Sequence, residues 1–491
     1  MMRDYLLVYI NGQRHEIRGE EAFFSLSDYL RYTRGLTGTK VVCAEGDCGA
    51  CTIIRGSLRD GREDLHYEGI NACITFMHLM DCTHIVTVEG LQDNGSLNPV
   101  QQAMIDHHGA QCGFCTPGFI CAMSDHANHC AYQSERPVEQ LETQRLRNAL
   151  TGNLCRCTGY APILNAGESI DLKAFTPLQQ RYDTPEMLSD LQAHASHSVQ
   201  IQTRERLFYA PNNLRDAAEF RVRRPESRIF SSATDMGVLI NKEKSDPVVI
   251  TNLSRIPEAH SLREENGQIV VGARVSLSQL ENFCRSRIPE FARLMRIFAS
   301  PQIKNKGTLV GNIANASPIA DTLPFLFVAE AEIELYSTQG TRRVNINRFY
   351  TGYKQLDMRP DELISRVYIP MLPKDEILRL YKVSNRKDLD ISTFTAAIRL
   401  QLDTQRQITG AAIAYGGVGP VVMRLPRTEA SLIGCPLDVA SFAAAGKLAR
   451  EEITPISDVR ASADYRYQLA ENILRKCQAE LEEQTSEAVV F

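Results

Sequence analysis

The chain has 491 residues, which exceeds the size at which one hydrophobic core stops growing, so about two to four domains are expected. Its 43% hydrophobic and 23% charged residues are typical of a soluble globular protein and argue against a disordered chain. The formal net charge of -5, with no lysine- or arginine-rich run, argues against nucleic acid or an anionic membrane as a partner.

The beginning of the chain, MMRDYLLVYINGQRHEI, has an apolar run of about six residues, too short for a signal-peptide core or a membrane span. We therefore expect a cytoplasmic protein. In a reducing cytoplasm, the 14 cysteines suit metal binding or redox chemistry better than a disulfide framework. Eleven of the 14 precede residue 158, so the first third of the chain carries a chemistry that the rest lacks.

The first predicted element is a β-hairpin, because Asn11 and Gly12 separate two strand-like runs and suit the positive φ angles of a type I′ turn. The stretch SLSDYLRY predicts a short helix with Ser25 or Ser27 as its cap. Further strands are expected over residues 52–58 and 84–89. Together these elements predict a small mixed domain over residues 1–90.

A helical unit is predicted over residues 91–171. Its first helix has Asn98 as N-cap, Pro99 at the first helical position and a glycine as its stop. Thr116 and Pro117 repeat this start signal in CTPGFICAMSDHAN. Two further helices are expected over residues 137–152 and 161–170.

The rest of the chain alternates between strand and helix patterns. Residues 172–206 are polar and weakly periodic, and we interpret them as an interdomain linker. An α+β domain is predicted over residues 207–370. Residues 371–491 predict a small sheet covered by helices. The expected fold class is therefore α+β multidomain.

Four cysteines of the first domain have C-x4-C-x2-C spacing, with the last one following after 21 further residues: Cys43, Cys48, Cys51 and Cys73. This is the ligand pattern of a plant-type [2Fe–2S] centre. Gly46 and Gly49 permit the tight turns that point backbone amides at the sulfurs. A zinc site would ordinarily use two short C-x2-C knuckles, which this segment lacks.

Four more cysteines form a C-x2-C and a C-x-C pair: Cys112, Cys115, Cys155 and Cys157. A C-x2-C pair occurs in zinc knuckles and redox dithiols, and a C-x-C pair alone specifies little. Because one pair precedes a predicted helix start and the other follows a helix stop, side chains from two helices can converge on one metal. The remaining cysteines are interpreted as packing or surface thiols: Cys82, Cys121, Cys130, Cys284, Cys435 and Cys477.

The stretches CAEGDCGACT, QCGFCTPG and NLCRCTGY together closely resemble the iron–sulfur motifs of the xanthine dehydrogenase or molybdenum hydroxylase family. The resemblance implies that the first four cysteines bind one [2Fe–2S] cluster in a ferredoxin-like β-grasp domain. The other four would bind a second cluster in a helical bundle. That second cluster would lie nearer the molybdopterin cofactor, which Gln111 would approach.

The stretch KGTLVGNIANASPIADTLP, over residues 306–324, is a loop of small residues whose amides can hold a diphosphate, with Asp321 accepting from a sugar hydroxyl. Turn chemistry alone also explains such a loop. The stretch resembles the GTxGGNIxxxSPxxD motif of the family's FAD domain. The resemblance implies that these residues line FAD: Phe298, Thr308, Gly311, Asn312, Asn315, Ser317 and Asp321.

A second FAD loop of the family, VxGGTDxG, resembles IFSSATDMG, which implies that Thr234, Asp235 and Gly237 contact FAD. The chain departs from the family pattern at four positions: Ser232, Ala233, Lys304 and Val310. Each departure is expected to add a Cβ where the resemblance implies that the backbone approaches the diphosphate. Two later stretches, KVSNRKDLDIS and DVRASADYR, resemble the family's C-terminal flavoprotein domain.

The resemblance implies a function. The family hydroxylates a purine or related heterocycle at molybdenum and passes electrons through two [2Fe–2S] clusters to FAD and then NAD+. Because the chain ends about where the flavoprotein region should finish, we expect the electron-transfer subunit of xanthine dehydrogenase. It would pair with a molybdopterin-binding large subunit, as an α2β2 heterotetramer. No catalytic side chain at the purine is expected in this chain.

Three alternatives stay open at this point. The same subunit can serve another heterocycle or aldehyde hydroxylase. A free-standing NADH-oxidising flavoprotein and a redox-sensing module without turnover are the other two. Co-purification with a molybdenum-containing partner would distinguish the first from the others.

Overall fold

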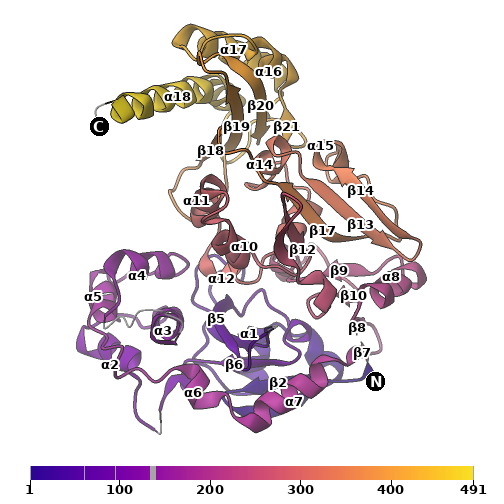
Figure 1. Cartoon of the computed structure of the whole chain (residues 1–491). Coiled ribbons are helices and arrows are strands. Elements are labelled where there is room, and N and C mark those ends of the chain that lie inside the picture. Colours follow the sequence, from indigo (N-terminus) through magenta and orange to yellow (C-terminus); the bar gives the residue numbers. More distant parts are fainter. Residues whose placement is uncertain (1, 60, 94, 133–139, 490–491) are drawn as a thin grey trace. The chain divides into compact units, whose positions relative to one another are not determined.

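A computed structural model describes residues 2–59, 61–93, 95–132 and 140–489. It divides into two compact units, Met1–Glu258 with Ser300–Thr308, and Ala259–Ala299 with Leu309–Phe491. Each unit contains both helices and sheets, so the predicted α+β multidomain class is confirmed (Figure 1). None of the helices in the described ranges has the length and apolarity that a membrane span needs.

The first unit begins with a mixed sheet in the strand order β3-β2-β6-β4-β5. Its strands are β2 (Leu6–Ile10), β3 (Gln13–Ile17), β4 (Thr52–Ser57), β5 (His66–Asn71) and β6 (Thr83–Val86). The predicted hairpin is confirmed, with φ angles of 48° at Asn11 and 82° at Gly12. Ser25 caps the short helix α1 (Leu26–Asp28), and the predicted helix then continues as one wider turn over Tyr29–Thr33.

Four helices follow this sheet: α2 (Pro99–Asp106), α3 (Thr116–Tyr132), α4 (Thr143–Leu150) and α5 (Ala161–Glu168). Asn98 and Gln101 form a reciprocal capping box at α2, as its start signal predicts. The helix predicted over 137–152 begins at residues 137–139, outside the described residues. Phe119 of α3 and Leu146 of α4 are buried in one core with Ile54 of β4, so the helices pack on this first sheet.

The segment interpreted as a linker, residues 172–206, has regular structure. It contains α6 (Leu178–Tyr182), α7 (Pro185–Ala195) and β7 (Ser198–Gln202). Met187 and Leu191 of α7 are buried in the core described above, and Asp183 accepts hydrogen bonds from the Leu65 amide and the Tyr67 hydroxyl. The helical pattern of α7 in the sequence is weak, because only about one residue per turn of this helix is buried.

A second sheet of the first unit has the order β1-β7-β8-β10-β9. Its other strands are β1 (Met2–Arg3), β8 (Leu207–Ala210), β9 (Arg228–Phe230) and β10 (Val249–Asn252). The helices that accompany it are α8 (Leu214–Arg223), α9 (Thr234–Asn241) and, from the returning segment, α12 (Pro301–Lys304). Short 3₁₀ turns lie at Gly19–Phe23, Met77–Leu79, Glu89–Leu91 and Pro257–Ala259.

The second unit contains an antiparallel sheet in the order β11-β12-β17-β13-β14. The strands are β11 (Leu262–Glu265), β12 (Gln268–Gly272), β13 (Glu332–Ser337), β14 (Gly340–Asn345) and β17 (Leu363–Pro370), with a small hairpin of β15 (Tyr350–Gly352) and β16 (Gln355–Leu356). The helices are α10 (Leu277–Cys284), α11 (Pro289–Ile297), α13 (Leu309–Ala314), α14 (Leu323–Val328) and α15 (Ile346–Phe349).

The last part is a sheet covered by helices, as predicted. The sheet order is β18-β19-β20-β21, over Ile377–Val383, Phe394–Leu402, Ile408–Gly416 and Met423–Arg424. The helices are α16 (Pro426–Leu432), α17 (Val439–Glu452) and α18 (Ala463–Val489). Figure 1 shows α16 and α17 beside β20, and Phe442 of α17 and Leu474 of α18 pack into one core with Tyr415 of β20.

Candidate metal centres and flavin site

The first cysteine cluster lies on a loop before β4 and on the turn after β5. The φ angles of Gly46 and Gly49 are 75° and 70°, which confirms that both glycines supply tight turns. Because of these turns, the backbone amides of Glu45 and Cys48 donate to the Cys43 sulfur over 3.4 and 3.5 Å. Amide donors aimed at a sulfur are typical of a loop that holds an iron–sulfur centre.

The four thiols of this cluster are neighbours. The Cys48 and Cys73 thiols hydrogen bond to Cys43 and hold its pKa well below the usual range. Hydrogen bonds to Cys43 and Cys51 raise the pKa of Cys73. Cys51 and Cys73 are each 2% exposed, whereas Cys43 and Cys48 are half-buried. All four cysteines predicted as ligands of the first centre are therefore brought together.

The second cysteine cluster consists of two thiol pairs. The sulfurs of Cys112 and Cys157 are 3.6 Å apart, and both residues are exposed. Burial, and then a hydrogen bond with Cys155, raises the pKa of Cys115 to about 12, so these two thiols form the other pair. Each pair joins one cysteine of the C-x2-C motif before α3 to one of the C-x-C motif before α5.

The thiol geometry fits a binuclear centre. Two thiolates that share one tetrahedral metal at about 2.3 Å lie about 3.8 Å apart, close to the Cys112–Cys157 separation of 3.6 Å. Within the described part of the chain, no three His, Cys, Asp or Glu side chains converge on a single metal ion. The contacts of Cys112 with Cys157 and of Cys115 with Cys155 pair the thiols of the second cluster, which suits two linked iron atoms with two ligands each.

The other six cysteines lie apart from both clusters, and none of the 14 cysteines forms a disulfide. Cys82, Cys121, Cys284 and Cys477 are buried, while Cys130 and Cys435 are half-buried. Burial raises the pKa of Cys82, Cys284 and Cys477 to about 12. These neutral thiols fit the predicted role as packing residues.

The two cysteine clusters are connected directly, which the sequence did not predict. The Leu154 amide donates to the Cys48 carbonyl over 2.9 Å, and the Asn153 side chain donates to the Gly49 carbonyl over 3.0 Å. A Cβ atom at Gly49 would lie 2.1 Å from the Gly152 carbonyl oxygen. The loops that carry Cys48 and Cys155 therefore touch through their backbones.

The predicted flavin residues fall in both compact units. In the first unit, Ala233 has a φ of 58° and precedes α9, which contains Thr234, Asp235 and Gly237. A Cβ atom at Gly237 would lie 2.4 Å from the Ile74 carbonyl oxygen, so this glycine allows α9 to pack on the loop after Cys73. Asp235 is exposed, and Thr308 is buried.

The second unit holds the other predicted flavin residues. Part of the stretch expected to be a loop forms α13, because Leu309, Val310 and Ile313 bury one face of a helical turn. Asn312 accepts a hydrogen bond from Thr322 over 2.6 Å, and the Asn315 carbonyl and side chain both accept from Lys354. Three others are the exposed Gly311 and the half-buried Ser317 and Phe298.

Asp321 is the most constrained of the predicted flavin residues. It is 5% exposed, and its carboxylate accepts from Lys382 over 2.9 Å and from the Ser392 hydroxyl. Burial raises the pKa of Asp321, whereas Lys382 and Ser392 lower it. The Lys382 side chain is 1% exposed and also donates to the Asp390 carbonyl over 2.8 Å. Lys382 is the first residue of KVSNRKDLDIS, a stretch that resembles the family's C-terminal flavoprotein domain, but its contact with Asp321 was not predicted.

Gln111, predicted to approach the molybdenum cofactor, is exposed and directly precedes Cys112. Two of the four family departures, Ser232 and Ala233, lie immediately before α9. The other two, Lys304 and Val310, are 7% exposed each and lie on α12 and α13.

Four domain-family models match the chain in order. They are described as a 2Fe-2S iron-sulfur cluster binding domain (residues 8–78), a [2Fe-2S] binding domain (87–168), an FAD binding domain in molybdopterin dehydrogenase (197–372) and a CO dehydrogenase flavoprotein C-terminal domain (379–481). The chain therefore contains two [2Fe–2S]-binding domains and an FAD-binding domain, and the predicted cofactors of this chain are confirmed.

Curated relatives match most of the chain. A xanthine dehydrogenase of Emericella nidulans is 27% identical over 486 residues, which cover 88% of this chain and 35% of that protein. Xanthine dehydrogenase 1 of Arabidopsis thaliana is 29% identical and is matched over 87% of this chain and 36% of its own length. The chain thus spans about a third of the length of these relatives.

Solved structures match part of the chain. The Cu,Mo-CO dehydrogenase in its cyanide-inactivated form matches with a TM-score of 0.52 and 26% identity, covering 55% of this chain and 94% of that chain. Quinoline 2-oxidoreductase from Pseudomonas putida 86 matches with a TM-score of 0.52 and 24% identity, over 55% of this chain and 94% of that one. The second likeness shows the fold alone.

Proposed function

We propose that this chain, whose domains are the iron–sulfur and FAD part of the molybdenum hydroxylase family, is the electron-transfer subunit of a xanthine dehydrogenase. Electrons from purine oxidation at a molybdenum centre on a partner subunit would cross this chain and reduce NAD+. When bound, each [2Fe–2S] cluster would carry one electron at a time. FAD would collect two electrons and pass them on together to a nicotinamide.

The observation that carries this proposal is the contact between the two thiol clusters. The Cys48 carbonyl accepts from the Leu154 amide, and Leu154 directly precedes Cys155, so a short covalent and hydrogen-bonded path joins the two sets of ligands. We assign Cys43, Cys48, Cys51 and Cys73 to the first centre and Cys112, Cys115, Cys155 and Cys157 to the second. The backbone contact fixes their separation, which a relay needs and a pair of independent structural metal sites does not.

The exposure of the second centre supports a partner on that side. Cys112 and Cys157 are exposed, and Phe114 and Leu154 beside them are 47% and 45% exposed. Apolar side chains around exposed metal ligands are suited to an interface that covers them. We place the molybdopterin-binding subunit here, next to Gln111, in an α2β2 assembly.

On the flavin side, we assign to FAD the residues predicted from the sequence in both units. Asp321 would accept from a flavin sugar hydroxyl, and Lys382 and Ser392 would hold its carboxylate in place. The chain's own residues bind, orient and shield the cofactors. They leave purine chemistry to the partner, so we assign no catalytic side chain here.

The substrate and the compartment are also part of the proposal. Relatives named xanthine dehydrogenase match nearly nine-tenths of the chain, and they support xanthine as the substrate. NAD+ as the acceptor follows from the resemblance of the sequence motifs. The absence of disulfides among the 14 cysteines supports a reducing, cytoplasmic location.

The test is anaerobic purification of the chain together with its co-purifying partner. We expect four iron atoms and one FAD per chain by the two-cluster assignment, a molybdenum-containing partner, and bleaching of the visible spectrum by xanthine without NAD+. Bleaching by another heterocycle or an aldehyde but not by xanthine would show that the enzyme acts on a different substrate. Absence of a molybdenum partner would overturn the proposal.

A pair of cysteine variants tests the ligand assignment. Cys157→Ser removes one thiol of the second centre and should lower the iron content by about half, because one of two binuclear centres is lost. Cys435→Ser changes a half-buried thiol outside both clusters and should leave iron unchanged. Equal iron content in both variants would refute the assignment of Cys157.

A further inference from the structure

Lys306 is a buried lysine between α12 and α13. The residue is 6% exposed, and its Nζ donates to the Thr75 hydroxyl over 2.8 Å. Among the residues that the structure describes, no carboxylate lies within ion-pair distance of this amine. A buried ammonium without a counter-ion is costly, because the interior solvates a charge poorly. An ammonium at this position therefore needs an anion nearby.

The residues that contact Lys306 lead to the ligands of the first centre. Thr75 follows Cys73 by two residues, and its hydroxyl donates to the Asn71 carbonyl over 2.7 Å. The Asn71 side chain in turn lies 4.0 Å from the Cys51 sulfur. Standard bond lengths then place the Lys306 amine within about 13 Å of the Cys73 Cα.

The other charged groups near Lys306 are already paired. Glu68 forms ion pairs with Arg55 and Arg59. Burial raises the pKa of Glu68, but Arg55, His66 and Arg59 together lower it to about 2. Burial is the main cause that lowers the pKa of Lys306 well below its usual range, and the charge of Arg55 adds to this effect. The charge of Glu68 raises the pKa but does not compensate. The protein without its cofactors therefore disfavours the ammonium.

His78 supplies no charge to this region. It is 1% exposed, and burial followed by the repulsion of Lys306 and Arg206 lowers its pKa to about 3, so the imidazole is neutral. Four aromatic rings surround it: Phe23, Phe76, Phe208 and Phe230. The first centre, whose ligands Cys51 and Cys73 are connected to Lys306 through Thr75 and Asn71, is a further source of negative charge in this region.

We propose that the Lys306 ammonium is the counter-charge of the first iron–sulfur centre and raises the reduction potential of that centre. The proposal rests on the assignment of Cys51 and Cys73 as ligands. Reduction adds one electron, and hence one negative charge, to a centre that thiolates already make anionic. A fixed positive charge in a buried environment stabilises the reduced form more than the oxidised form, and net charge near a cluster is one of the terms that sets its potential.

The experiment is a redox titration of the anaerobically prepared protein, followed by electron paramagnetic resonance. The signal that remains in Cys157→Ser identifies the first centre. Lys306→Met removes the charge, Lys306→Arg keeps it, and Lys447→Met removes an exposed lysine of α17 in the other unit. We expect Lys306→Met to lower the equilibrium constant for reduction of the first centre at least tenfold, which is 59 mV for one electron. Lys306→Arg and Lys447→Met should stay within twofold of the wild type.

Should Lys306→Met fail to retain iron, Lys306→Gln replaces it, because glutamine can still donate to Thr75 without the charge. A constant within twofold of the wild type in the neutral variant overturns the proposal. An equal shift in Lys306→Arg overturns it as well, since the effect would then follow packing and not charge. Loss of the iron signal from the wild-type protein would instead refute the ligand assignment, so the two failures are distinguishable.

Discussion

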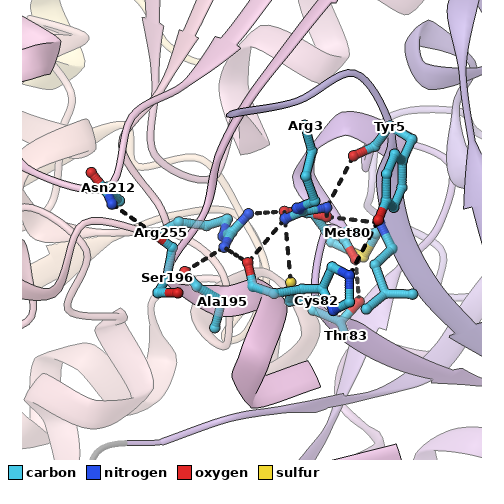
Figure 2. A network of polar contacts seen from close by, with 12 residues as sticks. Arg3, Tyr5, Met80, Cys82, Thr83, Ala195, Ser196, Asn212 and Arg255 are labelled. Atoms are coloured by element: carbon cyan, nitrogen blue, oxygen red, sulfur yellow. Dashed lines mark hydrogen bonds and ion pairs between the residues drawn. The ribbon is translucent and has the colours of Figure 1, made fainter. Parts of the chain in front are cut away.

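The Asp81 carboxylate accepts two hydrogen bonds from the Arg3 guanidinium, over 2.9 and 2.8 Å, at a site where both side chains are almost fully buried. Arg255 pairs with the same carboxylate, and the Leu7 amide donates to it over 2.8 Å. Both arginines also donate to the His194 carbonyl at the end of α7. Figure 2 shows the Arg3 and Arg255 side chains extending toward each other. One carboxylate thus joins the ferredoxin-like sheet, α7 and the segment after β10.

Asp81→Asn should strongly destabilise the protein. Asparagine leaves two buried guanidinium groups without an anion, and breaking a buried pair in this way costs about 3–5 kcal/mol. The midpoint of thermal unfolding, followed by circular dichroism, should fall by roughly 10 °C. Asp4→Asn is the control, because Asp4 pairs with Arg18 at an exposed site and such pairs contribute about 1 kcal/mol or less. Equal effects of both variants would contradict the role given to Asp81.

Gly49→Ala should damage both metal centres at once. Its φ of 70° disfavours a side chain, and the new Cβ would lie 2.1 Å from the Gly152 carbonyl oxygen, so the two ligand loops must separate. We expect iron to be lost from both centres. Gly19→Ala has the same kind of backbone, with a φ of 57° and nothing within 4 Å, and should cost only about 1 kcal/mol with full iron content. Iron retention in Gly49→Ala would show that the loops do not depend on this contact.

Lys382→Met should weaken FAD binding. The Asp321 carboxylate would lose its buried cation, and because burial already raises the pKa of Asp321, the carboxyl group would become protonated more readily. A hydrogen bond to a charged group contributes about 1.5–3 kcal/mol, so the FAD dissociation constant should rise roughly 10- to 100-fold. The measurement is the fluorescence of released flavin during dilution. Lys387→Met, at an exposed position of the loop that follows β18, should bind FAD as tightly as the wild type.

Asp125 makes stability fall as the pH rises. It lies on α3 and accepts from the Gly69 amide over 2.9 Å, and burial raises its pKa from 3.8 to about 7. Because the folded protein holds this proton more tightly than the unfolded chain, the contribution is complete below about pH 4 and is lost as the pH rises through about 7. Asp125→Asn cannot ionise, so relative to the wild type it should gain a few kcal/mol as the pH rises from about 4 to about 7, with little further change above about pH 7.5.

The measurement for Asp125 is the thermal midpoint of both proteins across that pH range. Asp106→Asn serves as the control, because Asp106 is exposed on α2. A difference between Asp125→Asn and the wild type that stays constant with pH would refute the assigned titration.

The amino-acid sequence by itself determined the local features of this protein. The spacing of the cysteines, the turn at Asn11 and Gly12, and the cap at Asn98 depend on neighbouring residues, and the structure contains each of them as predicted. Two [2Fe–2S] domains and an FAD domain were predictable for the same reason, because their motifs are short and contiguous.

Only the tertiary structure decided how these parts are joined. Lys306 reaches Thr75 across 231 positions, and Lys382 reaches Asp321 across 61. The segment interpreted as a linker became α6, α7 and β7 because its few apolar residues and Asp183 find partners in the ferredoxin-like domain. Such contacts cannot be predicted from a local sequence pattern. The element that buries a side chain comes from a distant part of the chain, and the residues next to that side chain in the sequence do not depend on it.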